Sequence, residues 1–196
     1  MKIPIFPLNG AIIFPNTNLP LNIFEERYIE MVDYSLSNNK IIGMIQHKEN
    51  NELYDVGCYG KITAFNETPD KRYLINLEGK DCFKVIREVN TDYKFRICEI
   101  EIFRDYNNNK LSDKLKIELI KYYRKYNEIK NINLSFDELS KLDIIDLLKL
   151  IVMISPFETN IKQLCLEMKS NTELYESVLS ALKIELASNY QVISVN

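Results

Sequence analysis

The sequence of 196 residues lacks most of the features on which catalytic and metal sites depend. It has one histidine, His47, which stands among Gln46, Lys48 and Glu49. A Ser-His-Asp or Cys-His arrangement would have to use this residue, and its polar neighbours are typical of a solvated loop. The cysteines at positions 58, 82, 98 and 165 include no Cys-x-x-Cys pair, which argues against a disulfide framework or a zinc site. We expect four free thiols in the core.

Other absences restrict the location and the ligands. No window is apolar over the roughly 20 residues that a membrane span requires, and prolines interrupt the amino terminus before a signal-peptide core could form. These features predict a cytoplasmic protein. The net charge of -3, from 25 basic and 28 acidic side chains, argues against nonspecific nucleic-acid binding. The pairs Gly60-Lys61 and Gly79-Lys80 lack the rest of a P-loop. We therefore predict no catalytic residue, no metal ligand and no cofactor.

What is present is enough apolar sequence, 46% of the residues, to bury a core. The organising segment is residues 1–34, in which Pro7, Pro15 and Pro20 restrict the backbone between apolar residues. Short extended pieces are expected there, followed by a helix from Glu25. This helix has an apolar stripe at Tyr28, Met31, Val32 and Leu36.

Several β-rich runs follow this helix. They cover residues 40–46, 56–65, 72–78, 82–89 and 93–103. A type I turn at 68–71 predicts a hairpin, and a second turn is expected at Gly79-Lys80. The alternation of the last run slips by one residue, which predicts a β-bulge near Ile97 and Cys98. Short strands with one helix indicate a small barrel-like sheet and argue against alternating βαβ units.

After residues 107–110 the pattern has a helical period. Apolar stripes predict four helices that form a small bundle. The residues of these stripes are Leu111, Leu115, Leu119, Tyr122 and Tyr126; Ile144 to Ile154; Ile161, Leu164, Cys165 and Met168; and Leu174, Val178, Leu182 and Leu186. Helix starts are indicated by Asp143 and by capping boxes at 135–138 and 170–173, whereas Asn189 begins a tail without helical signal.

Several short phrases resemble the amino-terminal domain of the Lon protease family. They are Pro-Ile-Phe-Pro-Leu at 4–8, Phe-Pro at 14–15, Leu-Pro-Leu at 19–21, Ile-Phe-Glu-Glu-Arg-Tyr at 23–28, Tyr-Asp-Val-Gly-Cys at 54–58, Leu-Glu-Gly-Lys-Asp-Cys-Phe at 77–83 and Ile-Lys-Gln-Leu at 161–164. Their order and spacing span residues 3 to 166. Asn16 and Cys82 depart from the family pattern, which has glycine and arginine at these places, and any ligand role of that arginine is in doubt here.

The resemblance implies an α+β fold, in which a PUA-like β-barrel with one packed helix (residues 1–106) precedes a carboxy-terminal four-helix bundle (residues 107–196). It also implies a stand-alone, noncatalytic member without the ATPase and protease domains. Such a domain would recognise unfolded or extended polypeptides, and a separate ATP-dependent protease is a candidate partner. Glu25, Arg27 and Tyr28 match the family, and their expected task is to fix the first helix against the barrel.

The leading hypothesis is a protein-binding module with an apolar groove between barrel and helical half. Its candidate lining consists of Phe14, Leu19, Leu21, Phe24 and Tyr28, each of which could instead be plain core. The alternative is an RNA-binding PUA-like module, which requires a basic face. A small-molecule enzyme would require a deep cleft with converging ionisable groups.

Overall fold

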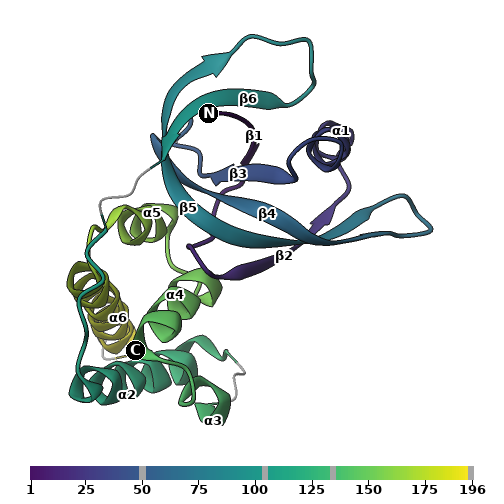
Figure 1. The fold of residues 1–196 in the computed structure, drawn as a ribbon. Coiled ribbons are helices and arrows are strands. Elements are labelled where there is room, and N and C mark those ends of the chain that lie inside the picture. The colour runs from purple at the N-terminus through teal and green to yellow at the C-terminus, as the bar shows by residue number, and fades with distance from the viewer. Residues whose placement is uncertain (49–51, 103–105, 133–135, 194–196) are drawn as a thin grey trace. The chain divides into compact units, whose positions relative to one another are not determined.

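The computed structural model describes residues 1–48, 52–102, 106–132 and 136–193. These residues group into two compact units, a strand-rich one and a helical one (Figure 1). The first unit comprises Met1–Arg104 and Pro156–Leu166, and the second comprises Asp105–Ser155 and Glu167–Asn196. The sequence analysis placed a single division after residue 106. The assignment of residues 1–106 and 107–196 to separate subdomains stays a prediction. The contacts add residues 156–166 to the strand-rich unit.

The first unit is built on one sheet. Its elements are β1 (Lys2–Pro7), β2 (Asn18–Ile23), α1 (Glu26–Leu36), β3 (Ile41–Ile45), β4 (Val56–Glu67), β5 (Tyr73–Val89), β6 (Arg96–Ile102) and, as far as Leu166, α5 (Thr159–Glu167). Among the described residues the strand order is β2-β5-β4-β3-β1-β6, and β5 also pairs with β6. Five strands therefore form a ring, and β2 is attached to it along β5 (Figure 1).

The strands of the ring are buried on both faces where α1 covers them. Ile3 and Ile5 of β1 belong to a core cluster with Phe83, Cys98 and Ile100. On the opposite face of β1, Phe6 packs against Tyr28 of α1, with ring centroids 4.5 Å apart. Since alternate residues of a strand point to opposite faces, β1 needs apolar side chains at nearly every position. Its sequence, Ile-Pro-Ile-Phe-Pro, supplies them.

The same double burial explains why the bulge predicted in β6 is wrong. Residues 96–99 of β6 pair with β1 without a register shift. The irregularity lies on the other side, where β5 takes up one extra residue, Ile86, opposite Glu99 and Ile100. Ile97 and Cys98 are both buried because both faces of β6 are covered at this point. The break in the apolar alternation of β6 therefore marks the point at which both faces of the strand are buried, and it does not mark a bulge.

The turn predicted at Gly79-Lys80 is also wrong, because β5 continues through it. Lys80 is an extra residue between the pairs Tyr59 with Asp81 and Gly60 with Gly79. Gly79 is needed for close approach, since an added Cβ would collide with the carbonyl oxygen of Phe14. The expected hairpin at 68–71 is confirmed, and β4 and β5 pair up to Glu67 and Tyr73.

The second unit is helical. Its helices in the described residues are α2 (Asp113–Lys130), α3 (Phe136–Leu139), α4 (Ile144–Ile154) and α6 (Asn171–Ile193). The predicted limits of α4 are confirmed, and the Asp143 side chain accepts hydrogen bonds from the amides of Ile145 and Asp146 at its start. The buried face of α2 includes Tyr123 where the sequence stripe placed Tyr122.

Two helix starts were predicted from capping boxes. The first includes Ser135, which lies outside the described residues. At the second, the Ser170 hydroxyl accepts from the Glu173 amide at 3.2 Å, and the Glu173 carboxylate accepts from the Lys169 amide at 2.9 Å. The helix then runs four residues beyond Asn189, where the sequence predicted its tail. The mixed α+β class is confirmed.

The helix α5 differs most from its sequence prediction. Its expected apolar stripe contained Ile161 and Leu164, but Leu164 is 52% exposed. The buried residues are Lys162, Gln163, Cys165 and Leu166. A charged and an amide side chain thus lie on the inner face of this helix, and hydrogen bonds must satisfy them there.

Candidate functional site

A pocket of about 280 Å³ opens in the strand-rich unit. Three segments line it: residues 6–9, at the end of β1 and just beyond it; residues 21–25, at the end of β2; and residues 27–28 of α1, together with His47. Figure 1 shows that β2 leads directly into α1, so one short connection supplies two of the three walls. We call this hollow the β2 pocket.

The floor of the β2 pocket is aromatic. Tyr28 is 7% exposed and packs on Phe6, which is 5% exposed. The guanidinium carbon of Arg27 lies 4.5 Å from the centre of the Tyr28 ring, and Arg27 Nη2 is 2.8 Å from Glu25 Oε2. A cation over the face of an aromatic ring is attracted by the ring's negative face. The Phe6–Tyr28 contact holds the first turn of α1 against β1, as the sequence predicted for Tyr28. The contacts of Arg27 and Glu25 lie within the start of α1, and the same role for these two residues stays a prediction.

Burial keeps the Tyr28 phenol neutral. Burial raises the pKa of Tyr28, Arg27 lowers it and Glu25 raises it again, and the net change is upward. At neutral pH the hydroxyl therefore keeps its proton. A neutral phenol can donate one hydrogen bond and accept others, and it does not act as a base.

The wall nearest to solvent carries Phe24, whose side chain is 66% exposed. Leu21 of β2 is half-buried beside it. Isolated exposed apolar residues are common, but Phe24 stands at the rim of a pocket, which makes it a candidate contact residue. Leu21, Phe24 and Tyr28 are three of the five residues that the sequence analysis named.

The other two named residues do not line the β2 pocket. Phe14 is 4% exposed, and its amide donates to the Thr17 hydroxyl oxygen at 3.1 Å. Leu19 is half-buried in β2 opposite Leu77 of β5. Both residues help to hold β2 and the segment before it in place.

Next to the pocket, β2 pairs with β5 on one side, and no second strand pairs with it among the described residues. The carbonyl of Thr17 accepts from the Gly79 amide at 2.8 Å, so residue 17 points toward β5. In an antiparallel ladder the hydrogen-bonding direction alternates, which turns the backbone groups of Asn18, Pro20 and Asn22 outward. This agrees with Pro20, because a strand proline belongs where no ladder donor is needed.

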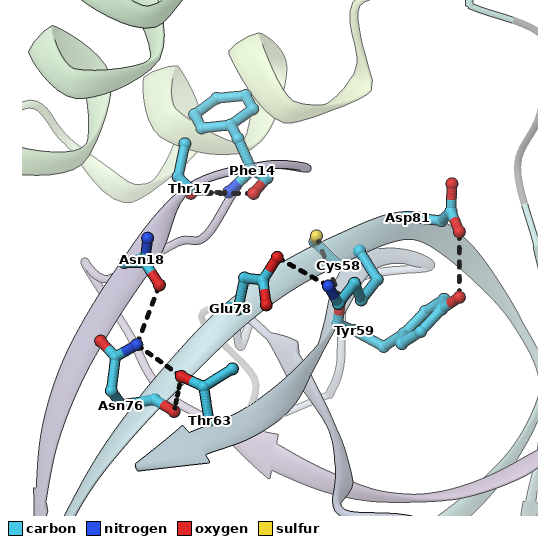
Figure 2. A network of polar contacts seen from close by, with 10 residues as sticks. Phe14, Thr17, Asn18, Cys58, Tyr59, Thr63, Asn76, Glu78 and Asp81 are labelled. Atoms are coloured by element: carbon cyan, nitrogen blue, oxygen red, sulfur yellow. Dashed lines mark hydrogen bonds and ion pairs between the residues drawn. The ribbon is translucent and has the colours of Figure 1, made fainter.

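The outer surface of this part of the sheet is polar (Figure 2). Asn76 Nδ2 donates to Asn18 Oδ1 at 2.8 Å and to Thr63 Oγ1 at 2.7 Å. Glu78 pairs with Lys80 at 2.6 Å. The two bonds of Asn76 join β2, β5 and β4 side by side, whereas the pair of Glu78 and Lys80 lies within β5.

One pocket residue was missed by the sequence analysis. His47 was interpreted as a solvated loop residue, yet it is half-buried and lines the β2 pocket. Its amide donates to Asn9 Oδ1 at 2.8 Å, and it forms an isolated β-bridge with Leu53. The contact with Asn9 joins His47 to a pocket residue 38 positions away in the sequence. No local sequence pattern signals them.

The polar face of α5 is bound to the same unit. Gln163 Nε2 donates to the Val56 carbonyl at 3.0 Å, and Gln163 Oε1 accepts from Gln46 Nε2 at 3.1 Å. Lys162 Nζ donates to the Gly10 carbonyl at 2.7 Å. The Lys-Gln phrase singled out in the sequence thus holds a helix to the sheet, which is a structural role.

A larger hollow of about 600 Å³ lies in the second unit. Its lining includes the charged residues Arg124, Glu128 and Asp137 with two asparagines. Arg124 lies over the ring of Phe136, 5.0 Å from its centre, so part of the apolar lining is already covered. This surface offers less to an apolar side chain than the β2 pocket does.

Within the described ranges, no group of three or more His, Cys, Asp or Glu residues is placed to hold a metal ion. A membrane-crossing length of apolar helix is likewise not found in the part of the chain that the structure describes.

The arrangement of a strand ring, an attached β2 and a set of helices is that of Lon amino-terminal domains. The structure aligns over 92% of its length with a Lon N-terminal domain protein from Xanthomonas campestris, covering 98% of that chain at a TM-score of 0.69 and 16% identity. It aligns over 93% of its length with the N-terminal domain of a Mycobacterium avium complex Lon protease, covering 98% of that chain at a TM-score of 0.71 and 13% identity. At these identities the likeness establishes the fold.

The sequence establishes the family. Residues 2–183 match the family described as the ATP-dependent protease La (LON) substrate-binding domain, and the chain belongs to this family. It is 24% identical over 202 residues to the Lon protease of Buchnera aphidicola subsp. Acyrthosiphon pisum, covering 95% of this chain and 25% of that relative. It is 28% identical over 109 residues to that of Dictyoglomus thermophilum, covering 53% of this chain and 14% of the relative. The chain thus spans a quarter or less of the length of these relatives.

Proposed function

We propose that this chain is a noncatalytic module that binds extended or unfolded polypeptide segments at the β2 pocket. The observation that carries the proposal is the exposed Phe24 at the rim of a pocket with an aromatic floor. Membership of the substrate-binding family supports the same role. In this proposal Leu21, Phe24 and Tyr28 contact the bound polypeptide. Phe14 and Leu19 do not contact it and instead help to hold β2 in place.

The binding energy would come mainly from one apolar side chain of the bound segment. Burying a Leu- or Phe-sized side chain contributes about 1.5–3 kcal/mol, and part of this offsets the entropy that an extended segment loses on binding. The pocket volume of about 280 Å³ admits one or two such side chains. We therefore expect weak affinity, roughly micromolar to millimolar, which suits a site that must accept many sequences.

The outer edge of β2, which pairs with no strand among the described residues, would add backbone pairing. An extended segment placed beside it could meet the outward groups of Asn18 and Asn22, as in other complexes where a peptide extends a sheet. Pro20 between them has no N–H, so the edge offers an interrupted ladder. The interruption limits how strongly β2 pairs with other strands and protects the edge from aggregation.

In this proposal the module presents polypeptides to a separate ATP-dependent protease, and it acts in the cytoplasm. The relatives named Lon protease support the link to proteolysis. A pull-down from the native cell followed by mass spectrometry tests the partner, and cell fractionation tests the location. Recovery of a protease only with a chain that keeps Phe24 would support both the partner and the site.

The charge distribution weighs against RNA binding. At least nine Lys or Arg side chains in the described residues form ion pairs with carboxylates, among them Arg87 with Glu99 at 2.8 Å and Lys130 with Glu185 at 2.8 Å. A nucleic-acid surface needs cations that remain available to phosphate. Binding to a polyanion that falls steeply with salt would contradict this conclusion.

The test uses a permanently unfolded polypeptide, such as reduced and carboxymethylated lactalbumin, with affinity measured by fluorescence anisotropy. Phe24→Ala should weaken binding about fivefold or more, since truncating an aromatic anchor costs at least about 1 kcal/mol. Because Phe24 is 66% exposed, the variant should keep the thermal midpoint of the wild type.

The matched control is Ile117→Ala in α2, which truncates another apolar side chain that is 69% exposed. Binding by this variant should equal that of the wild type. Equal loss in both variants would point to nonspecific apolar adhesion, and full binding by Phe24→Ala would remove the β2 pocket from the proposal.

A further inference from the structure

Two of the free cysteines face each other across neighbouring strands. Cys58 of β4 and Cys82 of β5 are direct partners in the antiparallel ladder. Side chains at such positions lie on the same face of the sheet with their Cβ atoms about 4.5–5.5 Å apart. Their separation of 24 positions in the sequence hides this relationship, since no spacing motif connects them.

The backbone already has the separation that a disulfide requires. Opposed residues of an antiparallel pair have Cα atoms about 4.5 or 5.5 Å apart, depending on the kind of pair, and disulfides span about 4.4–6.8 Å between Cα atoms. Either kind of pair therefore falls in the permitted range. Only a small approach of the two Cβ atoms is needed, because disulfides place these about 3.5–4.5 Å apart.

The two thiols also interact in the reduced structure. The pKa of Cys58 is raised well above its usual value, first by complete burial and then by a side-chain hydrogen bond with Cys82. The Lys80 amide, at the extra residue of β5, also donates to Cys58 and acts in the opposite direction. The two thiols therefore face each other in the ladder and interact before any oxidation, so only a small local adjustment is needed for them to react.

The two cysteines differ in access. Cys58 has no exposed surface, whereas Cys82 is half-buried. A reagent from solvent can therefore reach Cys82 first. Cys58 is protected from solvent and is reached only through its neighbour, so the pair combines an accessible thiol with an adjacent resolving thiol.

We propose that Cys58 and Cys82 are a site of reversible oxidation at which a low-molecular-weight disulfide, such as oxidised glutathione, converts the two thiols into a cross-strand disulfide. The Cys82 sulfur, after losing its proton to solvent, attacks one sulfur of glutathione disulfide; the external S–S bond breaks and one glutathione thiol leaves. The Cys58 sulfur then attacks Cys82 Sγ and breaks the mixed disulfide, and the proton of Cys58 passes to the departing glutathione sulfur, which leaves as the second glutathione thiol. Two protein thiols lose two electrons in total, and one external disulfide becomes two thiols.

The other cysteines provide internal comparisons. Cys98 of β6 lies opposite Ile3 of β1 and Glu88 of β5. Cys165 of α5 is 2% exposed, and burial raises its pKa to about 12. Neither is placed opposite a second cysteine in the pairings described, so both should remain thiols. The disulfide proposal does not depend on polypeptide binding. An experiment that contradicts one of these two proposals leaves the other intact.

The experiment treats the folded, full chain with oxidised glutathione, unfolds it in an alkylating reagent and counts modified cysteines by mass spectrometry. The wild type should fall from four alkylated cysteines to two, with a peptide that joins Cys58 to Cys82, and dithiothreitol should restore all four. Cys58→Ser should stop with one glutathione attached to Cys82. Cys165→Ser should still form the disulfide.

Because substitution of the fully buried Cys58 can impair folding, Cys82→Ser serves as the second variant. It removes the accessible thiol and should abolish both the disulfide and the glutathione adduct. The proposal is overturned if the oxidised wild type keeps four alkylatable thiols, or if its disulfide joins any other pair. It is also overturned if Cys58 of the Cys82→Ser variant acquires glutathione as fast as the wild type reacts with oxidised glutathione.

Discussion

The ammonium group of Lys162 in α5 donates a 2.7 Å hydrogen bond to the carbonyl oxygen of Gly10, 152 residues earlier in the chain. Lys162 is 4% exposed, and burial lowers its pKa. A buried cation of this kind is retained only with strong partners, because the charge has lost its hydration. The bond therefore fixes the carboxy-terminal contribution to the strand-rich unit at one defined point.

Replacing Lys162 by Met should lower the free energy of unfolding by about 1–2 kcal/mol. The Met side chain keeps most of the apolar stem but loses the part-buried hydrogen bond to the Gly10 carbonyl, and a hydrogen bond from a charged group contributes about 1.5–3 kcal/mol. Part of this is offset because the desolvated charge is removed. Urea unfolding at neutral pH measures the change.

Leu164→Ala, at the 52% exposed position on the same helix, is the control and should change stability by less than about 0.5 kcal/mol. A Met variant as stable as the wild type would show that the bond contributes nothing.

Gly79→Ala should destabilise the protein more than any other glycine substitution proposed here. The added Cβ would meet the carbonyl oxygen of Phe14, and neither backbone can move easily because Gly79 bonds Thr17 and Asn16 on the same segment. Overpacking against backbone costs about 1–3 kcal/mol, and we expect the upper end of this range. The thermal midpoint is the measurement.

The control for that substitution is Gly10→Ala. Gly10 has a φ of 73° and nothing within 4 Å of an added Cβ, so only the left-handed backbone opposes alanine. Its cost should be about 1 kcal/mol. If Gly79→Ala were no more damaging than Gly10→Ala, the close approach of β5 to Phe14 would not restrict residue 79.

Asp143→Ala should destabilise α4 by about 1 kcal/mol. Asp143 Oδ1 accepts from the Ile145 amide at 2.7 Å and from the Asp146 amide at 3.0 Å, and these donors have no partner inside the helix. Asparagine can accept the same bonds, so Asp143→Asn should keep most of the stability. Chemical unfolding of both variants separates the cap from a general effect of substitution, which would lower them equally.

The features that the sequence predicted correctly depend on neighbouring residues. The limits of α4 follow from Asp143 before it and Ser155-Pro156 after it, and both signals act through local backbone geometry. The hairpin at 68–71 is of the same kind. Leu21, Phe24 and Tyr28, three of the five candidate residues, lie within one short connection beside the β2 pocket, and their role in binding stays a prediction.

The features that it missed depend on distant partners. Apolar periodicity could not place Lys162 and Gln163 on the buried face of α5, because their burial requires carbonyls of Gly10 and Val56. His47 reaches the β2 pocket through Asn9 in the same way. Alternation in β6 failed because both faces of this strand are covered at Ile97 and Cys98, which makes apolar residues favourable on both sides.

The last prediction concerns alkaline pH and Tyr175 of α6. Its hydroxyl donates to Glu118 Oε2 at 3.0 Å, and burial together with this carboxylate raises the pKa of Tyr175 to about 12. In the unfolded chain a tyrosine ionises near pH 10. Since the folded pKa is the higher one, the contribution of Tyr175 to stability is complete below pH about 10 and is lost as the pH rises through about 12.

At pH 8, Tyr175→Phe should therefore be less stable than the wild type by about 1 kcal/mol, and the difference should shrink as the pH approaches 12. Glu118 also pairs with Lys183, whose Nζ is 3.7 Å from Glu118 Oε1. The comparison is therefore repeated with Lys183→Met added to both the wild type and the Tyr175→Phe variant. Urea unfolding at several pH values measures the difference, and a gap that stays constant from pH 8 to 12 would contradict the coupling of Tyr175 to Glu118.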